Sequence, residues 1–317
     1  MTTLITGAAG FIGAYTARRM AELNQATVQL DNLNGYYSVE LKQARIAQFA
    51  LNPLVIDVAD SAALMRCFEM YRPSRVIHLA AQAGVRHSIE APNDYLHSNL
   101  TGFLNILEAC RRFPVEHLVF ASTSSIYGTQ TETPFREEMS IQTPMSFYAA
   151  TKGANELMAH AYAHLYGIPC TALRFFTVYG AWGRPDMAPI LFSRAILAGR
   201  PIDVFNGGDM LRDFTHVNDI VEGILGALNV PPPKEKPFAV YNLGAGAPVE
   251  LNHFIALIEK MLGQTAIRVR KPMQPGDMRA TFADTSAAKA AFGYEPKMPL
   301  EIGTAELVAW VKSYYKT

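Results

Sequence analysis

Gly7-Ala8-Ala9-Gly10-Phe11-Ile12-Gly13, the segment at residues 7–13, is the most informative part of this sequence. An apolar, β-prone run at residues 2–6 precedes it, and a helix-like stretch at residues 11–23 follows it. Glycine at this spacing permits a tight turn and lets the backbone approach a pyrophosphate, which the N–H groups at a helix start can bind. An ordinary strand-to-helix turn is the alternative, because a glycine triple alone is weak evidence. The neighbouring residues therefore decide between the two interpretations.

A carboxylate after the second β-type run favours a dinucleotide site. Residues 26–31 form this run, which ends at Asp31, 18 positions beyond Gly13, and Asn32 follows. A carboxylate at this place can accept hydrogen bonds from the diol of an adenosine ribose, and it would repel a 2′-phosphate. The sequence therefore predicts dinucleotide binding, with NAD favoured over NADP.

β-type and helical segments alternate through the first half of the chain. The further β-type runs are residues 54–58, 75–80, 115–122 and 170–175, and the helical patterns between them are near residues 38–49, 61–71, 92–112 and 147–166. This alternation predicts an α/β fold of the Rossmann type, with a doubly wound parallel sheet. Runs that are apolar on both faces, such as residues 118–120, fit a sheet that helices cover on both sides.

The rhythm changes after about residue 176, where Pro and Gly become frequent and short elements alternate irregularly. We expect residues 1–175 to form the dinucleotide-binding Rossmann domain. Residues 176–317 would form mainly a smaller C-terminal α/β lobe that binds the substrate. Residues 213–243 could return to pack with the first domain.

Composition excludes several classes of protein. The 317 residues carry 28 Lys and Arg against 28 Asp and Glu, so the formal net charge is zero and offers no general attraction to nucleic acid or to an anionic membrane. Half of the residues are apolar, which argues against disorder. Cys67, Cys110 and Cys170 fit neither a disulfide framework nor a metal site. No apolar run reaches the about 18 residues of a membrane span, so we expect a cytoplasmic protein.

Two further loops lie at the expected carboxyl edge of the sheet, where open α/β sheets bind their ligands. The strand end at residues 57–58 could contact the adenine. The small residues at the next strand end, 79–82, would let a dinucleotide pass close to the backbone. The residues at these two strand ends are Asp57, Val58, Leu79, Ala80, Ala81 and Gln82.

A YxxxK motif, Tyr148 and Lys152, opens a predicted helix, and the spacing of four places both side chains on one helix face. An ordinary tyrosine has a pKa of about 10 and is a poor base, but a nearby ammonium favours the phenolate. Tyr148 could then take a proton from a hydroxyl while hydride leaves for NAD. Hydroxyl side chains at residues 122–125 end a predicted strand beside the cofactor. The YxxxK motif and a polar strand end are each common in unrelated proteins. Their order along the chain, after the glycine loop and Asp31, favours a site for hydride transfer.

In this order the motifs resemble the extended short-chain dehydrogenase/reductase family of nucleotide-sugar epimerases and dehydratases, over essentially the whole chain. The matching segments are GAAGFIG (7–13), DNLNGYY (31–37), HLAAQAGVRHS (78–88), STSSIYG (122–128), YAATK (148–152), RFFTVYG (174–180), RDFTHVNDI (212–220), YNLGAG (241–246) and QPGD (274–277). Within the family the chain is most similar to the UDP-glucuronate 4-epimerases.

The resemblance implies NAD-dependent epimerisation at C4 of a UDP-sugar, UDP-glucuronate to UDP-galacturonate, through a transient 4-keto sugar and hydride return. Tyr148 would take the O4 proton, with help from Thr123, and Lys152 would hold the nicotinamide ribose. A 4-keto glucuronate readily loses CO₂, so the site must fix its carboxylate, for which the candidates are Ser124, Ser125, Thr177 and Arg184. The diphosphate would fall to Arg212 and Arg279, and the uridine ribose to Asp277. Galactose-type relatives carry Arg where Gln274 stands.

The predicted cofactor residues are Gly7, Gly10, Phe11, Ile12, Gly13, Asp31, Asn32, Asp57, Val58, Leu79, Ala80, Ala81, Gln82, Asn99, Tyr148 and Lys152. The predicted substrate residues are Arg86, Ser124, Ser125, Thr177, Arg184, Arg212, Asp277 and Arg279. No metal is expected.

Three alternatives stay open. Two are enzymes on the same scaffold, a UDP-galactose 4-epimerase and a UDP-glucuronate decarboxylase. Decarboxylases carry Glu where Ser125 stands, and 4,6-dehydratases carry an Asp-Glu pair at 124 and 125. The third is a non-catalytic NAD-sensing regulator, a class that often lacks the YxxxK pair.

Dimerisation is a further expectation. The apolar positions on the predicted helix at residues 92–112 include Leu100, Phe103, Leu104 and Leu107. In relatives this helix and the one at 147–166 form a four-helix dimer interface, so we expect a homodimer; the alternative is that these side chains only cover the sheet.

Overall fold

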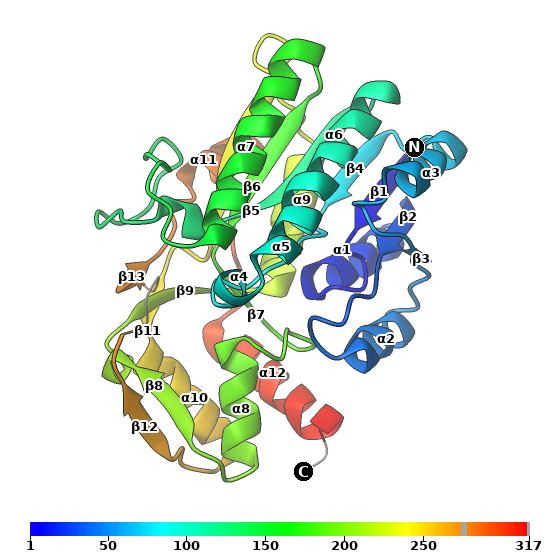
Figure 1. Ribbon diagram of the computed structural model, residues 1–317. Coiled ribbons are helices and arrows are strands. Elements are labelled where there is room, and N and C mark those ends of the chain that lie inside the picture. Colours follow the sequence, from blue (N-terminus) through cyan, green and yellow to red (C-terminus); the bar gives the residue numbers. More distant parts are fainter. Residues whose placement is uncertain (274–277, 316–317) are drawn as a thin grey trace.

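The computed structural model describes residues 1–273 and 278–315. Its central feature is a parallel sheet of seven strands in the order β10-β6-β5-β4-β1-β2-β3 (Figure 1). The strands are β1 (Thr2–Thr6), β2 (Ala26–Asp31), β3 (Leu54–Val55), β4 (Arg75–His78), β5 (His117–Thr123), β6 (Cys170–Phe175) and β10 (Phe238–Leu243). The predicted Rossmann-type α/β fold is confirmed.

Helices cover both faces of this sheet, which is why its strands are apolar on both sides. In β5, Leu118 and Phe120 face one core and Val119 faces the other. The first core includes α3 (Ser61–Tyr71), α6 (Gly102–Arg112) and α7 (Phe147–Tyr166), and the second includes α1 (Phe11–Glu22) and α9 (Val217–Leu228). Alternating side chains of one strand thus join two cores across a fully buried sheet.

Two predicted elements differ in detail. The β-type run at 54–58 is a strand only at Leu54–Val55, because the Asp57 side chain accepts a hydrogen bond from Ala59 N (2.8 Å) and turns the chain. The helix expected at 92–112 consists of α5 (Pro92–Tyr95), a π-helical segment at Leu96–Thr101, and α6. Other helices beside the sheet are α2 (Val39–Gln48), α4 (His87–Glu90) and α11 (Ser286–Phe292).

Most of the second half of the chain forms a smaller group of elements, which we call the smaller lobe (Figure 1). Its strands are β7 (Thr177–Tyr179), β8 (Ile202–Phe205), β9 (Leu211–His216), β11 (Pro248–Glu250), β12 (Arg268–Lys271) and β13 (Ala280–Thr281), and its helices are α8 (Ala188–Leu197), α10 (Leu251–Leu262) and α12 (Leu300–Tyr315). A third apolar core holds them together, with Phe214 stacked on Phe254 at 4.2 Å between ring centroids. The chain returns to the large sheet through α9 and β10.

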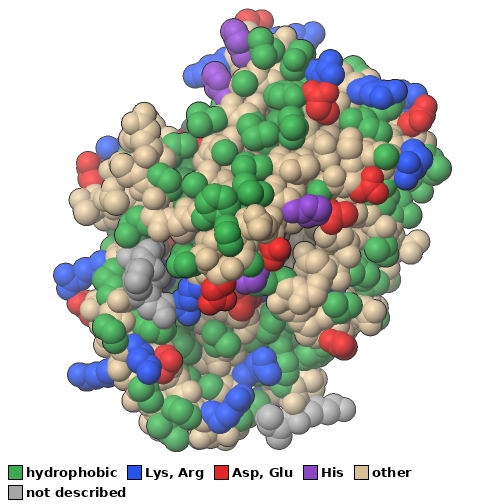
Figure 2. Space-filling model, in the orientation of Figure 1, with side chains coloured by type: hydrophobic (Ala, Val, Ile, Leu, Met, Phe, Trp, Pro, Cys, Tyr) green, Lys and Arg blue, Asp and Glu red, His purple; other side chains and the backbone are tan. Residues whose placement is uncertain are grey.

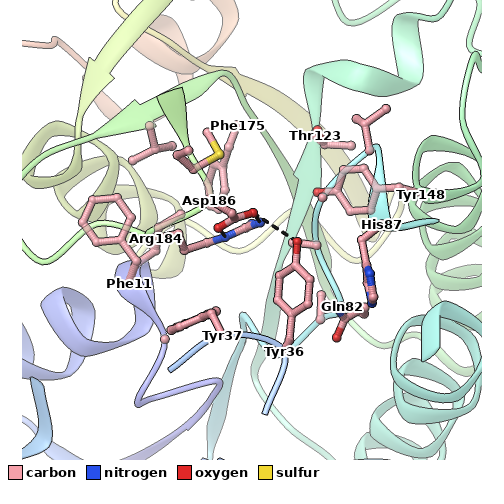
Figure 3. Close-up of a pocket in the computed structure, with 18 of the residues that line it drawn as sticks. Phe11, Tyr36, Tyr37, Gln82, His87, Thr123, Tyr148, Phe175, Arg184 and Asp186 are labelled. Atoms are coloured by element: carbon pink, nitrogen blue, oxygen red, sulfur yellow. Dashed lines mark hydrogen bonds and ion pairs between the residues drawn. The ribbon is translucent and has the colours of Figure 1, made fainter. Parts of the chain in front are cut away.

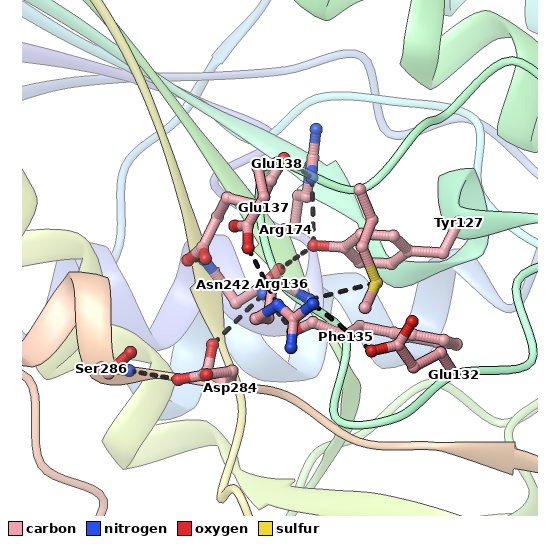
Figure 4. A network of polar contacts seen from close by, with 11 residues as sticks. Tyr127, Glu132, Phe135, Arg136, Glu137, Glu138, Arg174, Asn242, Asp284 and Ser286 are labelled. Carbon is pink, nitrogen blue, oxygen red and sulfur yellow. Dashed lines mark hydrogen bonds and ion pairs between the residues drawn. The ribbon is translucent and has the colours of Figure 1, made fainter.

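A buried polar network links α7 to the sheet. Arg174 on β6 donates to both carboxylate oxygens of Glu156 on α7, at 3.0 and 2.8 Å, and both side chains are at most 5% exposed. Ser122 donates to the same carboxylate at 2.6 Å. Arg174 also donates to the Tyr127 hydroxyl, which donates to Asn242 on β10 (Figure 4). The network therefore fixes α7 against three strands.

Two classes of site find no support in the described residues. Within residues 1–273 and 278–315, no helix is long and apolar enough to cross a membrane. Over the same ranges, no three His, Cys, Asp or Glu side chains are grouped so that they could hold a metal ion. The three cysteines are buried free thiols.

We expect Arg174→Met to lower the free energy of unfolding by about 3–5 kcal/mol, because Glu156 would stay buried without its cation. The matched control is Arg136→Met. Arg136 is an exposed arginine of the same region that pairs with Glu132 and Glu138, and its loss should cost about 1 kcal/mol or less. Urea unfolding of both variants measures the difference. Equal losses would contradict the importance of the buried pair.

Candidate active site

A cavity of about 1330 Å³ lies between the carboxyl edge of the large sheet and the smaller lobe. It exceeds the roughly 300–1,000 Å³ of a pocket for a single small molecule, so it has room for two ligands. Figure 2 shows basic and acidic side chains interspersed over this face of the molecule. The surface in this view thus carries no broad patch of one charge.

The glycine loop forms one end of the cavity. Gly7 has a φ of +72°, and a Cβ there would lie 2.7 Å from Ala80 N. A Cβ on Gly13 would lie 2.0 Å from the Gly7 carbonyl oxygen, so no other residue fits. Helix α1 begins at Phe11, directly after this turn, and its first N–H groups are without intrahelical acceptors. The loop thus has the shape and polarity that a pyrophosphate needs.

Asp31 closes the loop from the side. Its two carboxylate oxygens accept hydrogen bonds from Ala9 N (3.0 Å) and Leu33 N (2.8 Å), and its side chain also lines the cavity. Asn32 donates to Asp57 at 3.0 Å. Burial acts to raise the pKa of the Asp57 carboxyl, but hydrogen bonds from Ala59, Asn32 and His97 outweigh it and leave the pKa below its usual value. This end of the cavity therefore presents fixed acceptors for a ribose.

Gln82 provides the test of whether a dinucleotide fits. Its Nε2 is buried and has no hydrogen-bond partner among the described residues, and the residue lines the cavity. The side chain of Asn99 binds both the N–H (2.8 Å) and the carbonyl (3.0 Å) of Gln82 and so fixes its backbone. A buried donor without an acceptor is costly, and a bound cofactor would supply one. The residues present fit NAD.

The catalytic candidates meet in the middle of the cavity (Figure 3). Ser146 caps α7 by accepting from Ala149 N at 3.1 Å, so the helix starts where Tyr148 and Lys152 reach the cavity. Thr123 ends β5 beside them. Burial raises the pKa of Tyr148, whereas a hydrogen bond with Thr123 and the positive charge of Arg184 act to lower it.

Lys152 is almost completely buried at 2% exposure. Burial lowers the pKa of its ammonium to about 8, and the Glu156 carboxylate opposes this shift. Sequence reasoning gave Lys152 the task of activating Tyr148, and Glu156 and Arg184 were not expected to take part. Glu156 could have been found from the sequence, because it lies four positions after Lys152 on the same predicted helix. No local pattern indicated that Arg184 would act on Tyr148.

Arg184 enters the cavity as one half of an ion pair. Its Nε and Nη2 donate to the two oxygens of Asp186, at 3.1 and 2.5 Å. The Tyr36 hydroxyl also donates to Asp186, at 3.1 Å (Figure 3). Burial acts to raise the pKa of Asp186, but Arg184 holds it below its usual value. Sequence reasoning found Arg184 but neither of these partners.

The remaining arginines differ in position. Arg86 lines the cavity with its guanidinium 5.0 Å from the centre of the Phe205 ring, and Arg212 lines it nearby. Arg279 lies outside the lining and forms an exposed ion pair with Asp209 at 2.6 Å. Asp277 and Gln274 lie outside the described residues.

One cavity thus collects most of the predicted site. Of the predicted residues that the structure describes, Asn99 and Arg279 do not line it. Those that do are Gly7, Gly10, Phe11, Ile12, Gly13, Asp31, Asn32, Asp57, Val58, Leu79, Ala80, Ala81, Gln82, Arg86, Thr123, Ser124, Ser125, Tyr148, Lys152, Thr177, Arg184 and Arg212.

Comparison with known proteins gives consistent matches. The profile of the NAD dependent epimerase/dehydratase family matches residues 3–244. A probable UDP-glucuronate 4-epimerase of Rhizobium meliloti is 44% identical, over 100% of this chain and 98% of that protein. UDP-glucuronate 4-epimerase 2 of Arabidopsis thaliana is 42% identical, over 100% of this chain and 77% of that protein. A structure of UDP-glucuronic acid 4-epimerase from Bacillus cereus, in complex with UDP-glucuronic acid and NAD, has a TM-score of 0.92 at 30% identity, over 99% of this chain and 100% of that chain.

We expect the alkaline limb of the pH dependence of turnover to follow Lys152. Because its pKa is about 8, the ammonium is present below this pH, and turnover should decline as the pH rises through about 8. In Lys152→Arg the side chain stays charged, so no decline near pH 8 is expected, at a lower overall rate. Rate–pH profiles of both proteins are the measurement. The same limb in the arginine variant would assign the titration to another group.

Proposed function

This chain belongs to the NAD dependent epimerase/dehydratase family, and we propose that it is a UDP-sugar 4-epimerase that interconverts UDP-glucuronate and UDP-galacturonate. The observation that carries the proposal is the convergence of four features in one cavity: the glycine loop, Tyr148 with Thr123, hydroxyl side chains after β5, and Arg184. The relatives reported above are named as UDP-glucuronate or UDP-glucuronic acid 4-epimerases, which supports this assignment.

Tyr148 is the group that moves the proton in the proposed reaction. Its oxygen would accept the proton of the sugar O4 hydroxyl and return it at the end of the turnover. Thr123 would hold the same O4 by a hydrogen bond. NAD, when bound, would supply the hydride chemistry at C4, as acceptor in its oxidised form and as donor in its reduced form. Arg184 and Lys152 would stabilise the phenolate form of Tyr148 while the proton is on O4, before its transfer and after its return.

The hydroxyl groups that line the same cavity as Tyr148 suit an acidic sugar. Loss of CO₂ from a 4-keto glucuronate requires the breaking carbon–carbon bond to align with the ketone π system. Ser124 and Ser125 lie in the turn that follows β5, and Thr177 lies at the start of β7. Hydrogen bonds from these hydroxyls, together with the Arg184 charge, would hold the carboxylate away from that alignment. The proposed specificity rests on this hydroxyl cluster.

The UDP part of the substrate would lie towards the smaller lobe. Arg86 and Arg212 line the cavity there, together with the Phe205 ring. Two guanidinium groups can neutralise a diphosphate, and an aromatic ring can stack on a base. We therefore propose that residues 176–317 form mainly a nucleotide-sugar-binding lobe, and that residues 1–175 form the NAD-binding domain, which adds Arg86 and the turn after β5 to the substrate site.

Incubation with UDP-glucuronate tests the reaction. We expect a product of unchanged mass that co-elutes with UDP-galacturonate, whereas loss of CO₂ would indicate a decarboxylase, and turnover of UDP-galactose alone would indicate the galactose-type enzyme. Tyr148→Phe should lower kcat by about 10²–10⁴-fold, because it removes the general base. Tyr71→Phe, on the exposed side of α3, is the control and should keep the wild-type rate. Near wild-type turnover of Tyr148→Phe would refute the assignment.

We also propose a homodimer through α6 and α7. Phe103 and Leu107 on α6 are completely buried against the sheet, while Leu104 is 40% exposed. On α7, Leu157 and Leu165 are eight positions apart, so they share one helix face, and both are about two-thirds exposed. Such apolar side chains are typical of a contact surface.

Leu157→Glu should shift the protein from dimer to monomer, because it places a charge in the proposed contact. Sedimentation velocity measures the molecular mass of both forms. Met70→Glu, an equally exposed apolar residue on α3, is the control and should leave the dimer intact. A monomeric wild-type protein would refute the proposal.

A further inference from the structure

Arg45 on α2 is completely buried, yet no ion pair among the described residues involves it. Its guanidinium donates to three backbone carbonyls, those of Ala9 (3.1 Å), Trp182 (2.8 Å) and Gly183 (3.2 Å), and to the Tyr37 hydroxyl (2.7 Å). A buried charge is costly unless hydrogen bonds or a counter-charge compensate it. Here four neutral hydrogen-bond acceptors compensate the buried charge, and they hold the Arg45 guanidinium in one fixed orientation.

One end of the Arg45 guanidinium holds the glycine loop. The Ala9 peptide is bound on both sides, because its N–H donates to Asp31 (3.0 Å) and its carbonyl accepts from Arg45. The carbonyl oxygen therefore points to Arg45 on α2, and neither Ala9 nor Arg45 is among the residues that line the cavity. A carbonyl turned towards the cavity would repel a pyrophosphate. Arg45 thus fixes the polarity of the cofactor loop from behind.

The other end holds the turn that carries Arg184. Trp182 has a φ of +61°, which is a sparsely populated conformation for a residue with a side chain. Nε of Arg45 binds its carbonyl, and the Trp182 ring packs against Phe49 and Trp310, with centroids 6.2 and 5.3 Å away. Nη2 binds the carbonyl of the next residue, Gly183. The turn then delivers Arg184 into the cavity.

We propose that Arg45 is a positioning residue that couples the NAD pyrophosphate site to Arg184, and hence to the acidic group of the substrate. This inference rests on the proposed function. A single planar fork joins both loops, so a shift of either loop changes the hydrogen bonds of the other. Binding at the two sites is then linked, and the linkage is reciprocal. A bound pyrophosphate would also place negative charge close to the buried cation.

Three substitutions separate this coupling from a general loss of structure. Arg45→Lys keeps the charge but cannot reach both loops, because an ammonium is a point donor and a guanidinium is a fork. Arg184→Gln alters the substrate end alone. Arg66→Lys, at an exposed arginine on α3, is the matched control. For each protein we would measure the NAD retained per chain after gel filtration, and the Kd values of UDP-glucuronate and of UDP by calorimetry.

Arg45→Lys should retain less NAD than the wild type and bind UDP-glucuronate about tenfold more weakly, while the Kd of UDP stays within about twofold. Arg184→Gln should weaken UDP-glucuronate binding with the NAD content unchanged, and Arg66→Lys should change neither. If Arg45→Lys does not fold, Tyr37→Phe removes one of the four acceptors and should give smaller changes in the same direction.

The coupling is overturned if Arg45→Lys changes only one of the two properties, or neither. It is also overturned if UDP binding falls as much as UDP-glucuronate binding, since UDP has no group for Arg184 and its loss would indicate a purely structural role. Failure of the proposed function looks different. In that case wild-type protein would not bind or convert UDP-glucuronate, while the effect of Arg45→Lys on NAD retention would still be present.

Discussion

The contact between Gly13 and the carbonyl of Gly7, which leaves no room for a side chain, is the constraint on which the site depends. It lets α1 start directly at the end of β1, so that the helix N-terminus faces the carboxyl edge of the sheet. Strands β4 and β5 end at the same edge, and they bring Ala80 and Thr123 to the cavity. The glycine loop and the residues proposed to move the proton and to bind the substrate all line the cavity at this edge.

Features that depend on residues close in sequence are predictable from the sequence alone. The glycine loop, the YxxxK pair and the alternation of strands and helices belong to this group, and the parallel sheet follows from them. Element ends are less predictable, because single side chains determine them. Asp57 ends its strand early by accepting a hydrogen bond from Ala59, and the expected helix at 92–112 contains a π-helical segment.

Partners that are far apart in sequence are not predictable in this way. Arg45 and Trp182 lie 137 positions apart, and Tyr36 and Asp186 lie 150 positions apart. Arg184 and Asp186 are near neighbours, but only the fold shows that they form a pair inside the cavity. Asn99 is a similar case, since its side chain binds the backbone of Gln82 and does not line the cavity. The chemistry of these residues follows from tertiary contacts.

The acceptors that surround Arg45 have a consequence for protein engineering. Three of the four are main-chain oxygens, which every amino acid provides, so the side chains at positions 9, 182 and 183 are not what the guanidinium recognises. These hydrogen bonds would therefore tolerate other side chains at the three positions, but packing restricts two of them: the Trp182 ring contacts Phe49 and Trp310, and a Cβ on Gly183 would lie 3.1 Å from the Gly180 carbonyl oxygen. Position 45 itself offers no such freedom, because no other side chain supplies a planar, permanently charged fork.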